Sequence, residues 1–126
     1  MPTRPPVHND TRTQDYERQR GHARQQGYIT RWDRLSRAYR RMHPLCLGCQ
    51  VVGRTTLAQC CDHIVPHKGN YDLMWSPHNL QPLCHWHHNV IKQQLEHLHA
   101  QRLISDDDLR IDSAIAIALT KKKNLI

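Results

Sequence analysis

Two short stretches decide how this chain folds: Cys46-Leu47-Gly48-Cys49 and Cys84-His85-Trp86-His87. Each stretch places two metal-ligating side chains one tight turn apart, so both side chains can reach the same ion. The two pairs together supply four ligands, the number that a structural zinc ion takes in a closed tetrahedral site. We therefore predict a structural zinc site made by Cys46, Cys49, Cys84 and His87.

The remaining candidate ligands near these pairs fit the site less well. His85 competes with His87 for the fourth position, but it follows Cys84 directly, which places it on the wrong side of the turn. Cys60 and Cys61 are neighbours in a predicted strand, so their side chains point to opposite faces. They cannot both serve one site, and we expect one of them in the core.

The composition explains why such a small chain needs a metal. It has 126 residues, of which 38% are hydrophobic and 6% aromatic, and its mean hydropathy is −0.76. This is one domain at most, short of the large apolar side chains that stabilise small domains. The five cysteines are an odd number and residues 1–10 lack the apolar core of a signal peptide, so a disulfide framework is disfavoured. No apolar run is long enough to span a membrane, and we expect a soluble, cytoplasmic protein.

The positive charge is concentrated at one end of the chain. Residues 1–44 contain ten arginines against four acidic residues, a net charge of +6 out of the formal total of +7. Such a segment is typical of an arm that binds a polyanion. The alternative is a basic tail that is merely solvated.

Hydrophobic periodicity predicts several helices. Residues 1–28 are rich in Pro, Arg, Gln and Gly without a sustained apolar period, and we expect a disordered arm there. A helix is expected over residues 30–43, which Pro44 ends, and another over residues 88–100. The first of these carries an apolar stripe of Trp32, Leu35, Tyr39 and Met42.

The strands and the C-terminal region are less regular. Residues 55–64 are predicted to form a strand, and residues 65–82 a long loop with one more short strand. Ser105 and the three aspartates after it are typical of a helix start near Asp106. In the same region Ile115, Ile117 and Leu119 alternate as they would in a strand.

A second set of polar residues is not needed by the zinc: Asp62, His63, Asn79 and His88. They lie in the segments CDHIVPHKGN at residues 61–70 and SPHNLQPLCHWHHN at residues 76–89, and HPLCLGC precedes them at residues 43–49. Over about residues 28–100 the sequence resembles the HNH endonucleases, which are also called ββα-metal or His-Me finger nucleases. It is most similar to the small phage and prophage HNH proteins encoded beside DNA-packaging terminases.

The resemblance implies a small α+β fold with a ββα-metal core, a structural zinc and flanking helices. It divides the chain into a basic arm at residues 1–28, an HNH nuclease domain at residues 29–100 and a C-terminal extension, predicted to be helical, at residues 101–126. In this family the second pair of zinc ligands is commonly Cys-x2-Cys, and the last catalytic His follows it directly. Here His87 replaces that second Cys, and the roles of His87 and His88 could be exchanged. The spacing from Asn79 and the register from Cys84 favour His88 at the catalytic ion.

The resemblance also assigns catalytic roles. His63 would be the general base that takes a proton from water, since an imidazole titrates near neutral pH. Asp62 and His88 would hold one catalytic Mg²⁺ or Mn²⁺ at the scissile phosphate. Asn79 would either brace His63 or its loop through hydrogen bonds, or add a contact to the metal.

The expected substrate is double-stranded DNA, held through phosphate contacts in the cytoplasm of a bacterial host cell. The basic residues expected at this interface are Arg31, Arg34, Arg37, Arg41, Lys68 and Lys92. The phage terminase large subunit is the expected protein partner, and no membrane is involved. The main alternative is a non-catalytic zinc-stabilised DNA-binding protein, and a zinc-stabilised protein-interaction module is the third hypothesis.

Overall fold

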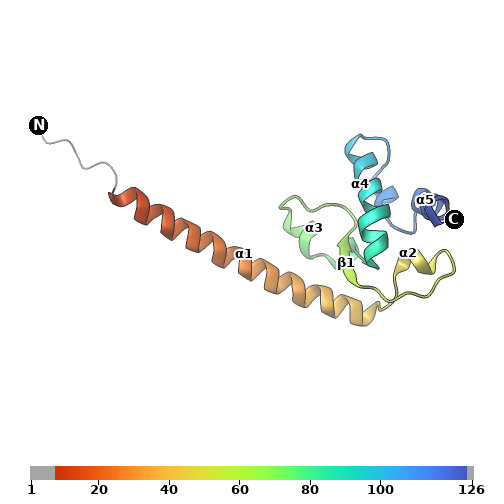
Figure 1. The fold of residues 1–126 in the computed structure, drawn as a ribbon, viewed down its shortest axis with the longest axis horizontal. Coiled ribbons are helices and arrows are strands. Elements are labelled where there is room, and N and C mark those ends of the chain that lie inside the picture. Colours follow the sequence, from red (N-terminus) through yellow and green to blue (C-terminus); the bar gives the residue numbers. More distant parts are fainter. Residues whose placement is uncertain (1–7, 125–126) are drawn as a thin grey trace, which may run out of the picture. The chain divides into compact units, whose positions relative to one another are not determined.

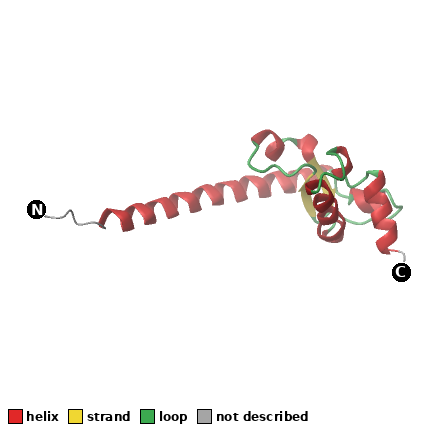
Figure 2. Ribbon diagram, turned by 90° about the horizontal axis from the view of Figure 1, so that it is seen from above, coloured by secondary structure: helices red, strands yellow, loops and turns green. Residues whose placement is uncertain are grey.

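The structure is a computed structural model that describes residues 8–124 and divides the chain into two compact units, Met1–Leu35 and Ser36–Ile126. The described part of the first unit is helical and belongs to α1, which runs from His8 to Met42. The second unit holds the end of α1, a sheet of two antiparallel strands and several short helices (Figures 1 and 2). The predicted α+β class is confirmed at this level.

Helix α1 corrects the prediction of a disordered arm over residues 8–28. Residues 1–7 lie outside the described residues. From His8 onward the segment contains no proline, and its many Arg and Gln side chains lose little rotamer freedom in a helix. The predicted helix over residues 30–43 lies within α1 apart from its last residue. Of its apolar stripe, Tyr39 is half-buried and donates a hydrogen bond to Leu80 O (3.0 Å), whereas Met42, the last helical residue, is 78% exposed.

The sheet is shorter than the sequence predicts. Strand β1 (Cys60–His63) pairs antiparallel with β2 (Leu80–Leu83), with Cys60 opposite Leu83 and His63 opposite Leu80. The beginning of the predicted strand, residues 55–59, is used elsewhere: Cys46 N donates to Thr56 O and Ala58 N to Pro44 O, both at 2.8 Å. That segment therefore braces the first ligand pair, which lies in the turn and the short helix α2 (Leu47–Gln50), instead of extending the sheet.

The connection between the strands is a compact loop. Asn70 caps the short helix α3 (Tyr71–Trp75) by accepting from Asp72 N (2.9 Å), and a single 3₁₀ turn, η1 (Pro77–Asn79), leads into β2. The helix that follows β2 begins as the wide turn η2 (His87–Lys92), which has π-helical hydrogen bonding, and continues as α4 (Gln93–Ala100). The predicted end at residue 100 is confirmed. Wide π turns occur often at functional sites.

The C-terminal region forms a helix, but it starts later than predicted. Asp107–Leu109 is only a 3₁₀ turn, η3, in which Asp108 Oδ2 accepts from the backbone and hydroxyl of Ser105. The last helix, α5, is Ala114–Asn124, and its start is marked by Ser113, whose hydroxyl accepts from Ala116 N (3.1 Å). The alternating Ile115, Ile117 and Leu119 are therefore helical.

This region completes the hydrophobic core of the second unit. Leu109, Ile111 and Ala116 are fully buried against the apolar face of the η2–α4 helix, where Ile91 and Leu95 are also fully buried. Residues 101–124 are thus part of the folded body. They are not an independent extension.

Truncating Leu109 is expected to lower the free energy of unfolding by about 2–5 kcal/mol, because Leu109→Ala leaves a cavity in a fully buried position. Leu103→Ala is the matched control, since Leu103 is 67% exposed, and should change stability by less than about 0.5 kcal/mol. Urea denaturation followed by circular dichroism measures both values. Equal effects of the two substitutions would contradict the assignment of Leu109 to the core.

Candidate metal centre and neighbouring polar cluster

A buried cluster of four potential metal ligands joins the turn at α2 to the beginning of η2. It consists of Cys46, Cys49, Cys84 and His87, whose ligand atoms all lie within 4.8 Å of one another. The three sulfurs are 3.4–3.6 Å from His87 Nδ1, and Cys49 Sγ is 3.8 Å from Cys84 Sγ. Zinc bonds of about 2.3 Å to sulfur and about 2.0–2.1 Å to nitrogen give tetrahedral edges of about 3.8 Å and about 3.5 Å. The predicted ligand group is confirmed, and its dimensions fit zinc.

The electrostatics of the cluster also favour a bound cation. Burial raises the pKa of the Cys46 thiol to about 12, so its thiolate is costly in this environment without a positive charge. Burial, assisted by the charge of Arg54, lowers the pKa of His87 to about 4. The imidazole is therefore neutral at pH 7, which is the form that binds a metal. A divalent ion would stabilise the thiolates directly.

Two residues that the sequence analysis did not single out shape this centre. Thr120 in α5 donates to Ala116 O (2.8 Å), and its hydroxyl oxygen lies 3.3 Å from His87 Nε2, where it can accept the imidazole proton. This contact turns Nδ1 toward the sulfurs, as outer contacts of metal-bound histidines usually do. Gly48 supplies space: a Cβ at this position would collide with the imidazole ring of His87. No sequence signal pointed to Thr120, because it is distant from the ligands along the chain.

The structure also resolves the competing ligands. His85 is exposed and outside the cluster, with its backbone N–H bonded to Gln59 Oε1 (2.9 Å), so the choice of His87 is confirmed. Cys61 is buried in the core, as expected for one of the adjacent pair, and Cys60 is half-buried with its thiol against Leu83 O (3.4 Å).

A second polar cluster lies where β1 meets η2. Asp62 is buried, and its Oδ1 is 3.5 Å from His88 Nε2. Its Oδ2 accepts from Gln81 Nε2 (2.9 Å) and lies 3.0 Å from Lys92 Nζ. His88 Nδ1 lies 3.1 Å from Asn89 Oδ1, and in the tautomer that donates there, Nε2 and Asp62 Oδ1 are two acceptors facing each other. A cation between them fits this arrangement.

His63 ends β1 next to this pair and is half-buried. Its Nε2 lies 3.0 Å from Met74 O, to which Nε2–H donates, so Nδ1 is the basic nitrogen. Burial lowers the pKa of His63 below its usual value of 6.5, although the hydrogen bond to Met74 opposes this. His67 packs edge-on against the His63 ring, with centroids 4.8 Å apart. The imidazole of His63 is therefore neutral at pH 7 and held in place.

Asn79 holds the loop that follows β1. Its side-chain amide donates to Val65 O and Leu73 O, and its carbonyl oxygen accepts from Val65 N, all at 2.9 Å. Asn79 thus makes the hydrogen bonds to the loop that were one of its two expected roles, the other being a contact to the metal. The loop so fixed includes Met74, the partner of His63.

The expected nucleic-acid contacts fall into two groups. The exposed residues are Arg31, Arg34, Arg37, Arg41 and Lys68. The four arginines belong to α1, and Lys68 lies in a left-handed turn (φ 46°) just before Gly69 (φ 86°). Lys92 is different, because it is only 1% exposed and enclosed by acceptors. The expectation that Lys92 contacts phosphate is wrong, since its ammonium faces the protein interior.

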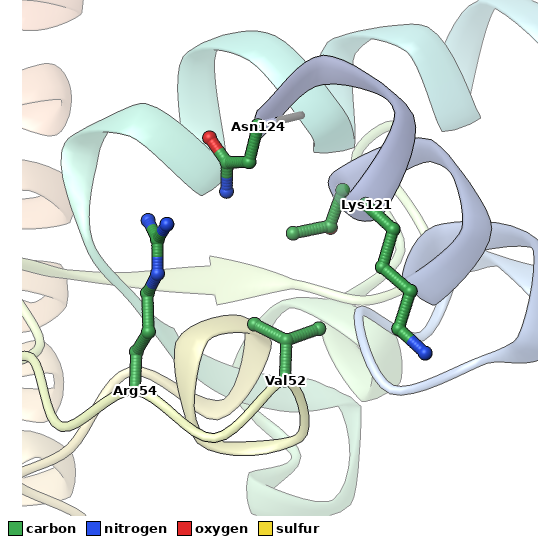
Figure 3. A pocket seen from close by; sticks show the side chains of 5 residues that line it. Val52, Arg54, Lys121 and Asn124 are labelled. Atoms are coloured by element: carbon green, nitrogen blue, oxygen red, sulfur yellow. The ribbon is translucent and has the colours of Figure 1, made fainter. Parts of the chain in front are cut away.

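A pocket lies on the outer side of the metal centre, between the end of the α2 turn and α5. It is lined by Val52, Arg54, Thr120, Lys121 and Asn124. Arg54 and Asn124 extend their polar ends toward each other above Val52, and the ammonium end of Lys121 points away from them (Figure 3). Thr120 connects this pocket to the metal centre, and the pocket shares no residue with the polar cluster at Asp62.

Comparison with family models, with curated proteins and with solved structures gives no match for this chain. Among the described residues, the Cys46–His87 cluster is the one group of three or more His, Cys, Asp or Glu side chains placed to hold a metal. In residues 8–124, no helix combines the length and the apolar character needed to cross a membrane.

Replacing Gly48 by Ala is expected to weaken zinc binding at least about tenfold, because the new methyl group displaces the His87 ring from the sulfurs. Competition with a chromophoric chelator measures the zinc affinity. Gly21→Ala is the control, since its Cβ meets nothing within 4 Å, and it should keep the wild-type affinity. Unchanged zinc binding in Gly48→Ala would contradict the geometry of this centre.

Proposed function

We propose that this protein is a metal-dependent DNA endonuclease of the HNH class, stabilised by a structural zinc ion at Cys46, Cys49, Cys84 and His87. The observation that carries the proposal is the second polar cluster, in which a neutral histidine adjoins a carboxylate–imidazole pair. The order of the elements supports it: two antiparallel strands followed by a helix are what a ββα core requires. His63 ends the first strand and His88 lies on the helix.

His63 acts as the general base. Its lowered pKa leaves it able to accept a proton at pH 7, and the Met74 carbonyl orients the ring and stabilises the imidazolium that forms. Asn79 maintains this orientation because it holds the loop between Val65 and Leu73. Its role in the reaction is positional.

Asp62 Oδ1 and His88 Nε2 hold the catalytic divalent ion, Mg²⁺ or Mn²⁺. The pair fits such an ion because two acceptors face each other at 3.5 Å and the His88 side chain is 39% exposed, which leaves room for phosphate and water. When bound, the ion supplies positive charge to the non-bridging oxygens and to the departing 3′ oxygen.

Exposed basic side chains bind the DNA backbone. Arg31, Arg34, Arg37 and Arg41 are exposed on α1, and Lys68 is exposed five residues after the end of β1. Lys and Arg contacts to phosphate give affinity and little sequence information. By its resemblance to terminase-associated HNH proteins, we propose that the chain cuts or nicks double-stranded DNA during phage genome packaging, with the terminase large subunit as partner.

Replacing His63, the proposed general base, is the direct test. His63→Ala is expected to slow cleavage of supercoiled plasmid by about 10²–10⁴-fold, because the attacking water loses its proton acceptor. The assay is run with Mg²⁺, with Mn²⁺ and with EDTA, and cleavage by the wild type should require the divalent ion. Nicked and linear products are separated on agarose.

His78→Ala is the matched control, because His78 is an exposed histidine from the same connection between the strands and should leave the rate unchanged. Zinc content is measured for each variant, so that loss of the fold is not mistaken for loss of the base. If the wild type shifts DNA in a gel but does not cleave it with any ion, the non-catalytic zinc-stabilised DNA-binding protein becomes the better description.

The pH dependence has a defined sign. A base must be neutral to accept a proton, and the pKa of His63 is lowered by burial, so kcat/KM should fall toward acid pH with a midpoint below 6.5. Initial rates at constant ionic strength and saturating Mg²⁺ measure the profile. An acidic limb whose midpoint lies above pH 6.5 would show that His63 is not the titrating base.

A further inference from the structure

Lys92 is the most completely buried charged side chain among the described residues. Its ammonium group donates to His63 O (2.7 Å) and Glu96 Oε1 (2.8 Å), and it lies 3.0 Å from Asp62 Oδ2. An ammonium has three N–H donors, so these three acceptors satisfy it fully. A buried charge is costly unless it is paired in this way.

The position of Lys92 determines which oxygen of Asp62 is available to a metal ion. Lys92 and Gln81 both contact Oδ2, so Oδ1 alone is directed toward His88. The same ammonium holds the carbonyl of His63, the residue that carries the base. A single side chain from η2 therefore orients two consecutive residues of β1.

We propose that Lys92 is a positioning residue that serves as the resident cation of the Asp62 carboxylate: it reserves Oδ1 for a single divalent ion shared with His88 and weakens the binding of that ion. This inference rests on the proposed function, because it concerns the same ion site. A second divalent ion at Oδ2 is excluded by the ammonium already there. The η2 turn makes this arrangement possible, because it carries both His88 and Lys92 on one short segment that faces β1.

The proposal and a purely structural role for Lys92 predict opposite changes in metal binding. If Lys92 only supported the fold, its removal would disorder Asp62 and weaken binding of the ion. If Lys92 is the resident cation, removal leaves the buried carboxylate with no positive partner at Oδ2 and removes a charge that repels the ion. The divalent ion then binds more tightly.

Mn²⁺ binding to zinc-loaded protein, followed by the electron paramagnetic resonance signal of free Mn²⁺, tests this without DNA or activity. Lys92→Met is expected to lower the Kd for Mn²⁺ at least about tenfold. Mn²⁺ should also raise the Tm of Lys92→Met more than that of the wild type, because tighter binding to the folded state stabilises it more. Lys122→Met removes an exposed lysine on α5 and should leave the Kd unchanged.

Glu96→Gln provides a second variant should Lys92→Met not fold, because Glu96 is 39% exposed and tolerates substitution more readily. It deletes the acidic group that offsets Lys92, so Mn²⁺ binding is expected to weaken several-fold; unchanged or tighter binding would overturn the proposal. Asp62→Asn identifies the site, since the Mn²⁺ bound there should be lost.

The outcomes separate the two proposals. Asp62-dependent Mn²⁺ binding in the wild type, with equal or weaker binding in folded Lys92→Met, overturns the role of Lys92 and leaves the nuclease proposal standing. A wild type that binds no Mn²⁺ through Asp62 overturns the ion site itself, and with it the proposed function.

Discussion

The convergence of three thiols and one imidazole on a single point is the constraint on which the second unit depends. It joins the turn before β1 to the turn after β2, and so closes the sheet between them. Few large apolar side chains are available, and the core around the cluster is built from Leu83, Ile91, Leu95, Leu109 and Ile111. A metal bound there would supply folding free energy that such a small core cannot. The steric requirement at Gly48 and the hydroxyl of Thr120 follow from the same constraint, because both determine where the His87 ring lies.

The start of η2 contributes a histidine to the metal centre and another to the polar cluster at Asp62. His87 is buried against the thiols, and the next residue, His88, faces Asp62. Adjacent residues on a helix point in different directions, so one turn can contribute to two sites whose chemistry differs. One site is closed and sulfur-rich and suits a structural ion. The other is partly exposed, with oxygen and nitrogen atoms, and in the proposed function it would hold an ion that exchanges ligands with a substrate. In this arrangement the stability of the first site sets the geometry of the second.

Much of the candidate site was predictable because ligand spacing is a local property. The four metal ligands and the choice of His87 over His85 came from turn geometry alone. Asp62, His63, Asn79 and His88 came from a resemblance to a family, and the structure places His88 beside Asp62 and Asn79 in the loop that holds His63. The errors have physical causes. Composition suggested disorder for residues 8–28, although individual helix propensities there are high. The cap at Ser105 was assigned to the wrong element, because Asp108 binds Ser105 within a 3₁₀ turn and Ser113 caps the helix.

The sequence by itself determined the metal-ligand set and the helices predicted over residues 30–43 and 88–100, because each depends on spacing within one or two turns. The α+β class came from the family resemblance. Only the tertiary structure decided what surrounds these ligands and helices. Thr120 reaches His87, and Gln81 bridges Asp62 to the backbone of Ile111, through contacts between residues far apart in the chain. Lys92 shows the difference most clearly: in the sequence it is one basic residue among many, expected on the surface. Its burial beside Asp62 arises because β1 and η2 pack together, and a lysine enclosed by three acceptors is stable where a solvated one would have been expected.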